Sequence, residues 1–330
     1  MHEVEIKMRE AARTLLESGK VDLVLGFEQG SLPLRMRPCF ARNAGATVGL
    51  VWNDFCANNL AAYLPGLFQK PADVRGSWTA PTVAVVAKRC DARSVIELIK
   101  ENQIPRQNVV LIGMPCQGMV DPRKAQEAAG ANVTACKMAP DKQVELTTAE
   151  GGVAMSPREA ILADACLECA TPAPQGADVE IPGPSRPSAA NPYGRLSEFE
   201  SLTARERWDA FVGEISKCIR CYACRQACPN CYCKTCFIEQ SKPTWAGVGD
   251  ELSDVLLFHI GRIFHQAGRC VGCDACVRAC PKNIDLRLFT RKIVKDVQEL
   301  FGYVPGMSLD EQPPLCTFKE DDNESFITHP

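Results

Sequence analysis

The sequence of 330 residues lacks a long apolar run, a leader and an excess of charge of one sign. No stretch approaches the ~18 consecutive apolar residues that a transmembrane helix needs. The segment H-E-V-E-I-K-M-R-E at 2–10 does not have the charged and then apolar pattern of a secretory leader. The 37 basic residues are balanced by 40 acidic ones, and this net charge of −3 argues against a nucleic-acid partner. We therefore expect a cytoplasmic protein without a membrane span.

The motifs of several enzyme classes are also missing. No residues resemble a Ser–His–Asp set, and no pair of carboxylates is spaced for hydrolysis. No G-x-G-x-x-G follows the apolar run at 21–27, and no G-x4-G-K-[ST] is present. The sequence therefore gives no sign of a dinucleotide fingerprint, a phosphate-binding loop or a hydrolase centre.

Cysteine, in contrast, is abundant, with 19 residues. In a cytoplasmic protein, thiols at this density indicate metal ligands or redox groups rather than disulfides, and they suggest an oxygen-poor setting. Two segments share the spacing C-x2-C-x2-C-x3-C-P: C-I-R-C-Y-A-C-R-Q-A-C-P from 218 and C-V-G-C-D-A-C-V-R-A-C-P from 270. This is the spacing with which bacterial-type ferredoxins hold [4Fe–4S] clusters.

In two-cluster ferredoxins, the fourth Cys of each motif binds the cluster of the other motif. The first cluster is therefore expected on Cys218, Cys221, Cys224 and Cys280. The second is expected on Cys270, Cys273, Cys276 and Cys228. Zinc sites use paired C-x2-C without the third Cys and the C-P ending, so zinc and disulfides are the lesser interpretations.

The first half of the chain alternates between short apolar runs and amphipathic segments. Strands are expected at 21–27, 82–88, 108–114 and 144–148. Helices are expected at 3–18, 52–65 (with Asn53 or Asp54 as cap), 91–102, 121–130 and 157–166. Such alternation predicts an α/β domain over 1–170, with a mostly parallel sheet and flanking helices.

The rest of the chain changes character. A Pro-rich linker is expected at 171–193, extended along a surface, because it holds six Pro among small residues. From 194 to 306 the pattern is helical and includes the apolar helix 254–265 and the amphipathic helix 284–301, which predicts a mainly α-helical two-cluster ferredoxin domain. Residues 307–330 form an acidic C-terminal tail with K-E-D-D-N-E-S.

Several further cysteines have spacings that packing alone rarely produces. C-x2-C at 166–169 could be completed by Cys90, Cys116 or Cys136, and C-Y-C-K-T-C from 231 offers three more thiols. We expect at least one additional [4Fe–4S] cluster, with zinc or simple burial as the alternatives. Its candidate ligands are Cys90, Cys116, Cys136, Cys166, Cys169, Cys231, Cys233 and Cys236.

The Cys-rich segment 218–236 resembles the iron–sulfur segment of deazaflavin (coenzyme F-420) hydrogenase and formate dehydrogenase beta subunits. The segments V-D-L-V-L-G-F, N-N-L-A-A-Y-L-P and L-I-G-M-P-C-Q-G resemble the same family more loosely. The helical filling between the two cysteine motifs is similar to the α-helical ferredoxins of heterodisulfide reductase. The resemblance implies an electron-transfer subunit of an anaerobic oxidoreductase complex, with hydrogenase, formate dehydrogenase or heterodisulfide-reductase-like partner subunits.

The same resemblance implies a flavin (FAD) that exchanges hydride with a deazaflavin or NAD(P). If it is present, we expect it at the carboxyl ends of the parallel strands, in loops that contain Glu28, Gly30, Lys88 and Gly118. Three interpretations therefore stay open: a non-catalytic electron relay, which we favour, a flavin-containing subunit, and a zinc-stapled scaffold.

Overall fold

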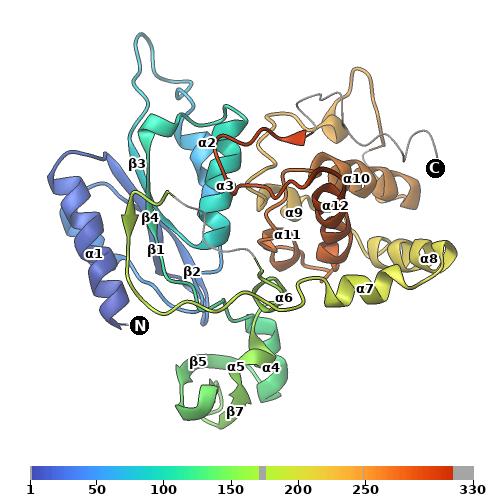
Figure 1. The fold of residues 1–330 in the computed structure, drawn as a ribbon, viewed down its shortest axis with the longest axis horizontal. Coiled ribbons are helices and arrows are strands. Elements are labelled where there is room, and N and C mark those ends of the chain that lie inside the picture. The colour runs from blue at the N-terminus through green and yellow to red at the C-terminus, as the bar shows by residue number, and fades with distance from the viewer. Residues whose placement is uncertain (1, 171–175, 248, 315–330) are drawn as a thin grey trace. The chain divides into compact units, whose positions relative to one another are not determined.

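The computed structural model describes residues 2–170, 176–247 and 249–314 (Figure 1). The chain divides into two compact units. Unit 1 comprises Met1–Ala92 with Ile104–Pro192, and unit 2 comprises Arg93–Gln103 with Tyr193–Pro330. The helix Arg89–Lys100 therefore contributes residues to both units.

Unit 1 is built around a five-stranded sheet in the order β2-β1-β3-β4-β8. Its strands are β1 (Leu23–Gln29), β2 (Met36–Ala41), β3 (Val83–Ala87), β4 (Val109–Gly113) and β8 (Val179–Glu180). All neighbours are parallel except β1 and β2, and β3 is buried along its whole length. A near-continuous apolar run is what a strand covered on both faces requires. The predicted parallel α/β architecture is confirmed.

Three of the five helices expected in unit 1 are present. α1 (His2–Glu17) packs on β1 and β3 and buries Met8, Ala12 and Leu15. α3 is the helix Arg89–Lys100. α4 (Pro122–Ala129) begins where the side chain of Asp121 accepts a hydrogen bond from the Arg123 N–H, and it ends at Gly130 in the left-handed conformation.

Two of the helix predictions were wrong, those for residues 52–65 and 157–166. Residues 52–65 contain only the 3-10 turn η2 (Leu60–Tyr63) and the single turn α2 (Leu64–Leu67), and the cap is Asn59. The Asn53 side chain instead accepts the N–H of Phe55, a local bond that competes with a helix. Residues 157–166 form two short helices, α5 (Arg158–Ile161) and α6 (Asp164–Leu167), because Leu162 and Ala163 are extended.

A second sheet lies within unit 1. It consists of the antiparallel strands β5 (Val133–Met138), β6 (Gln143–Thr148) and β7 (Val153–Pro157). The predicted strand 144–148 is thus present, but in this separate sheet. Val133, Val144 and Leu146 pack with Ile161 and Leu162 in a core of their own, which explains why α4 and α5 lie beside it in Figure 1.

Unit 2 is helical in its described part, as predicted. Its longer helices are α7 (Gly194–Glu200), α8 (Ala204–Ile215), α10 (Leu252–His265) and α12 (Leu286–Phe301). Phe211 of α8 meets Phe289 of α12 edge to face at 4.9 Å, in a core that also holds Ile215 and Phe258. Among the described residues, no helix combines the length and the apolar character needed to cross a membrane.

The linker and the tail are described only in part. Residues 171–175, and the tail from 315 with Cys316 and the acidic run, lie outside the described residues. The linker is not only an extended connector, because Val179 and Glu180 pair in parallel with Ile112 and Gly113 of β4. Shortly before the tail, the Pro305 carbonyl accepts two hydrogen bonds from the guanidinium of Arg93 in α3.

Candidate metal centres

The two cysteine motifs adopt the same backbone conformation. In the first loop, Arg220 and Tyr222 have positive φ angles of 50° and 58°. In the second, Gly272 and Asp274 occupy the equivalent positions, with φ of 69° and 58°. Alternation of left-handed and ordinary residues turns successive backbone N–H groups toward one point and creates an anion-binding concavity, which is common around iron–sulfur centres.

In each loop, a backbone N–H group donates a hydrogen bond to the sulfur of the first cysteine. The Arg220 N–H donates to Cys218 Sγ at 3.3 Å, and the Gly272 N–H likewise donates to Cys270 Sγ. A hydrogen bond to sulfur favours the thiolate, the form that binds metal. Burial raises the pKa of both Cys218 and Cys270, and in each loop this backbone hydrogen bond opposes the shift.

A short helix follows each loop and ends two residues before the fourth cysteine. α9 (Ala223–Gln226) leads to Cys228, whose N–H donates to the Arg225 carbonyl at 3.2 Å. α11 (Ala275–Arg278) leads to Cys280, whose N–H donates to the Val277 carbonyl at 3.1 Å. The two helices are neighbours in the structure, so each fourth cysteine is delivered near the other motif.

Four thiols line one cavity, and we call them the first thiol group: Cys218, Cys221, Cys224 and Cys280. The other lining residues are mainly apolar and include Ile219, Phe258 and Ile284. Burial, and after it the neighbouring thiols, raises the pKa of Cys224, although Arg262 opposes this shift. The cavity thus unites three cysteines of the first motif with the last cysteine of the second.

The second thiol group consists of Cys228, Cys270, Cys273 and Cys276. Burial raises the pKa of Cys270 to about 11, and the nearby thiols of Cys228 and Cys273 add to that shift. Burial also raises the pKa of Cys276, with Cys228 and Cys270 among its neighbours. Thiols that oppose one another's ionisation in a buried site are stabilised as thiolates by a bound cation.

Cys231 lies beside this second group rather than in a site with Cys233 and Cys236. Its sulfur forms a hydrogen bond with that of Cys228, and this bond lowers the pKa of Cys231. Gln266 Nε2 donates to Cys231 Sγ at 3.6 Å, and Gln266 Oε1 accepts from Cys228 Sγ at 3.7 Å. Cys233 is exposed, and Cys236 precedes the 3-10 turn η5 (Phe237–Glu239).

A third thiol group gathers in unit 1 and consists of Cys116, Cys166 and Cys169. Burial raises the pKa of Cys116 to about 11, and the thiols of Cys166 and Cys169 raise it as well. The Met119 N–H donates to Cys166 Sγ at 3.2 Å. Gly118, with φ +90°, lies so close that a Cβ there would be 3.2 Å from the Cβ of Cys166. The loop after β4 is therefore folded tightly over the C-x2-C segment.

The Pro-rich linker closes this third group. Cys116 N–H donates to Ser185 Oγ at 3.1 Å, and the Arg186 and Ala189 N–H groups donate to the carbonyls of Cys116 and Cys169. The Arg186 guanidinium bonds Glu159, and the nearby thiols help to raise its pKa. Cys90 follows the neighbouring strand β3, whereas Cys136 in β5 belongs to the core of the small sheet.

The residues expected at a flavin are engaged with the protein itself. The Lys88 ammonium is buried, 2.8 Å from Asp91 Oδ2 and 2.8 Å from the Asn58 carbonyl. The Glu28 carboxylate pairs with Arg37 at 2.9 Å. A Cβ at Gly30 would lie 2.3 Å from the Arg35 carbonyl, and Gly118 faces the third thiol group. These four residues therefore do not fit a flavin site in this structure.

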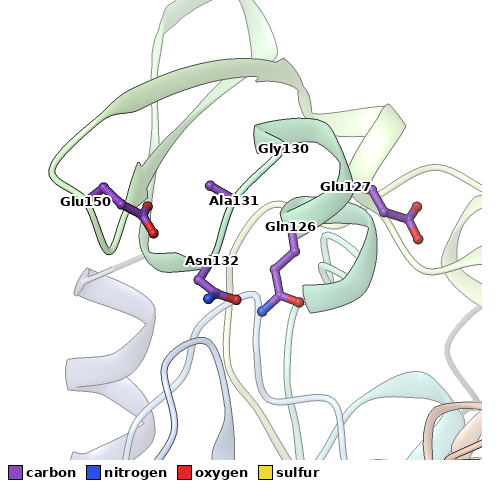
Figure 2. Close-up of a pocket in the computed structure, with 6 residues that line it drawn as sticks. All are labelled: Gln126, Glu127, Gly130, Ala131, Asn132 and Glu150. Atoms are coloured by element: carbon purple, nitrogen blue, oxygen red, sulfur yellow. The ribbon is translucent and has the colours of Figure 1, made fainter.

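A surface depression at the end of α4 is separate from the thiol groups. Figure 2 shows its lining side chains, with the Glu127 carboxylate directed away from the others. The residues are Gln126, Glu127, Gly130, Ala131, Asn132 and Glu150. None of them is a cysteine, and they do not converge on one point.

The sequence identifies His259 as a packed or exposed side chain of the spacer helix, and in the structure it is packed, at 1% exposed; sequence reasoning missed Arg262 of α10, which is 4% exposed. The available signal was a basic residue within an apolar helix, but the sequence does not show which way it faces. In the described part of the chain, no three His, Cys, Asp or Glu side chains stand at the spacing of a single metal ion.

Comparison with known families defines the class of the helical unit. Residues 214–284 match the family model described as a 4Fe-4S dicluster domain. The chain therefore contains a 4Fe-4S dicluster domain, and this prediction is confirmed. The match spans both cysteine motifs and the helix α10 between them.

The whole chain is similar to two named proteins. It is 26% identical to the F420-dependent formate dehydrogenase subunit beta of Methanocaldococcus jannaschii, in an alignment of 365 residues that covers 91% of each chain. It is 25% identical to the F420-dependent formate dehydrogenase 1 subunit beta of Methanococcus maripaludis, covering 91% of this chain and 90% of the relative. The resemblance predicted from the sequence is confirmed.

Among solved structures, the F420-reducing [NiFe] hydrogenase complex from Methanosarcina barkeri shows a weak likeness. The match covers 51% of this chain and 58% of that chain, at 14% identity and a TM-score of 0.36. So low a score supports no inference about this chain.

Proposed function

We propose that this protein is the iron–sulfur electron-transfer subunit of a formate dehydrogenase-like complex in an anaerobic organism. The first and second thiol groups would each hold one [4Fe–4S] cluster. One-electron transfer is the chemistry that such clusters supply when bound.

The observation that carries this proposal is the cavity of the first thiol group. Its four thiols come from both motifs in the exchanged pattern of two-cluster ferredoxins, with Cys280 beside Cys218, Cys221 and Cys224. The second group repeats the pattern, because the thiol of Cys228 acts electrostatically on those of both Cys270 and Cys276. A fold that exchanges its last ligands places two clusters close together.

The chain's own residues would hold and shield the clusters. The N–H groups of Arg220 and Gly272 stabilise the first thiolate of each loop. Phe258 and Ile284 exclude water from the first group, since both are 1% exposed. Burial and hydrogen bonds to sulfur are the main means by which a protein sets a cluster potential.

The first group also offers an approach for a partner. Cys221 is exposed, and the neighbouring Ile219 is 54% exposed. We place the entry or exit of electrons here. The partner class follows from the two relatives, whose names make them subunits of formate dehydrogenases.

The third thiol group is the place proposed for an additional [4Fe–4S] cluster. Cys116, Cys166 and Cys169 would supply three ligands. Cys90 is our choice for the fourth, because it follows β3, which lies beside β4 in the sheet and ends at the same edge. Cys136, Cys233 and Cys236 are not part of this proposal.

The alternative is a subunit that itself exchanges hydride with a deazaflavin or NAD(P) through FAD; the names of the two relatives make them F420-dependent. Because Glu28, Gly30, Lys88 and Gly118 do not fit a flavin, we derive no step through that group. Flavin content stays a prediction for which the described loops offer no support.

The deciding experiment is anaerobic purification followed by metal analysis and low-temperature EPR. We expect brown protein with about eight iron atoms per chain from the two motifs, and about twelve with the third group. A colourless, zinc-containing protein would contradict the proposal and favour a scaffold. A flavin spectrum with reduction of a soluble deazaflavin would support the alternative.

A further inference from the structure

Helix α10 carries two buried polar side chains on the face that meets the cysteine loops. His259 and Arg262 are three residues apart and therefore share that face. The other buried residues of the helix are Val255, Phe258 and Ile263, which are apolar. A polar pair in such a setting must find partners or destabilise the fold.

The guanidinium of Arg262 has one hydrogen-bond partner among the described residues, and two of its nitrogens have none. Its Nη2 donates to the carbonyl of Cys224 at 3.1 Å, whereas Nε and Nη1 are buried without a hydrogen-bond partner among the described residues. No carboxylate in the described part of the chain pairs with it. Burial lowers the pKa of Arg262, but the nearby sulfurs of Cys276, Cys228 and Cys224 act in the opposite direction and raise it well above its usual range.

The sulfurs that act on Arg262 thus belong to both thiol groups. Cys224 belongs to the first group, and Cys276 and Cys228 belong to the second. A buried cation without a carboxylate is costly unless a fixed negative charge lies nearby. A cluster with four thiolate ligands carries net negative charge, so it supplies the missing partner.

His259 faces the first thiol group. Its ring lines the cavity of Cys218, Cys221, Cys224 and Cys280 and meets Phe258 at 4.8 Å. Neither ring nitrogen has a hydrogen-bond partner among the described residues. The side chain therefore has an N–H group available within that cavity.

We propose that Arg262 and His259 are positioning residues that raise the reduction potentials of the clusters, Arg262 for both and His259 for the first. The proposal rests on the function proposed above. N–H donors at cluster sulfur, and a positive charge nearby, stabilise the reduced and more negative form.

The test is a redox titration of the full-length, anaerobically purified protein, followed by EPR. Arg262→Gln removes the charge, Arg262→Lys keeps it, His259→Leu removes the N–H, and His259→Gln restores a donor. Arg205→Gln is the matched control, because Arg205 is exposed on α8 of the same unit. Iron content is measured for each preparation.

For Arg262→Gln we expect both clusters to remain and both potentials to fall. At the wild-type midpoint, the ratio of oxidised to reduced cluster should rise at least tenfold, which is about 59 mV for one electron. Arg262→Lys should recover part of the shift. His259→Leu should lower only one potential, that of the cluster lost in Cys218→Ser, and His259→Gln should restore part of it.

Wild-type potentials in both Arg262→Gln and His259→Leu, with clusters intact, would overturn the inference. If both Arg262 variants lose iron, the His259→Leu titration alone tests the inference: a lowered potential supports it, and a wild-type potential overturns it. Wild-type protein without iron–sulfur clusters would instead refute the proposed function, so the two failures are distinguishable.

Discussion

Arg220 and Gly272 occupy the same place in the two cysteine loops, each two residues after the first cysteine of its motif, and both are left-handed. Glycine adopts this conformation at no steric cost, whereas arginine adopts it only at a steric cost. Arg220 is held there by its guanidinium, which donates to the carbonyls of Gly247 and Gly249 and to Tyr222 Oη. The two loops thus reach one backbone shape by different means.

The first prediction concerns Gly272→Ala. A Cβ there would meet only the Nη1 atoms of Arg287 and Arg291, both at 3.7 Å, so the cost comes from φ alone. We expect a loss of about 1–2 kcal/mol of stability, seen as a lower midpoint of chemical unfolding.

Gly302→Ala is the matched control, since Gly302 has φ +65° at the end of α12 and its Cβ would meet nothing within 4 Å. Both variants should lose similar stability, but only Gly272→Ala should change the EPR signal of a cluster. An unchanged signal in Gly272→Ala would contradict the role of this loop as a thiolate cradle.

The second prediction tests the exchange of ligands between the motifs. Because Cys280 lies in the cavity of Cys218, Cys221 and Cys224, Cys280→Ser should remove the same EPR signal as Cys221→Ser. Cys228→Ser should remove the other signal, together with Cys273→Ser. If Cys280→Ser instead matches Cys273→Ser, each motif binds its own cluster and the exchanged arrangement is wrong.

The third prediction concerns the thiols of unit 1. Cys166→Ser should lower the iron content by about four atoms per chain, because it removes one ligand of the third thiol group. Cys136→Ser is the control, since Cys136 packs in the core of the small sheet and should retain all iron. Equal iron content in the two variants would argue that Cys116, Cys166 and Cys169 are structural.

The cysteine motifs and the parallel sheet could be predicted because their signals are local. The spacing C-x2-C-x2-C sets one loop shape, and the run V-A-V-V-A can only be a buried strand or helix segment. The helix expected at 52–65 failed for a local reason as well, because the side-chain oxygens of Asn53 and Asn59 accept the N–H groups two residues further along the chain.

Other features depend on contacts between distant residues. β8 has only two residues and is a strand solely because β4 offers it a free edge. The closure of Cys116 by Ser185 and Arg186 joins segments about seventy residues apart. Likewise, the direction of Arg262 follows from the packing of α10, which periodicity does not reveal.

The last prediction separates a structural role of Lys88 from a flavin contact. Lys88 and Asp91 are 2% and 0% exposed, and their charged groups lie 2.8 Å apart. Lys88→Met should cost about 3–5 kcal/mol of stability, because it leaves the Asp91 carboxylate buried without its cation.

Asp91 Oδ2 also accepts the Lys88 backbone N–H at 3.0 Å, so Asp91→Asn preserves a hydrogen-bonding group at this helix start. The double variant Lys88→Met with Asp91→Asn should therefore be more stable than Lys88→Met alone, as measured by denaturant unfolding. Lys20→Met, at an exposed position, should have little effect. If Lys88→Met unfolds like the wild type, the lysine is not held by the fold and becomes available to bind a cofactor.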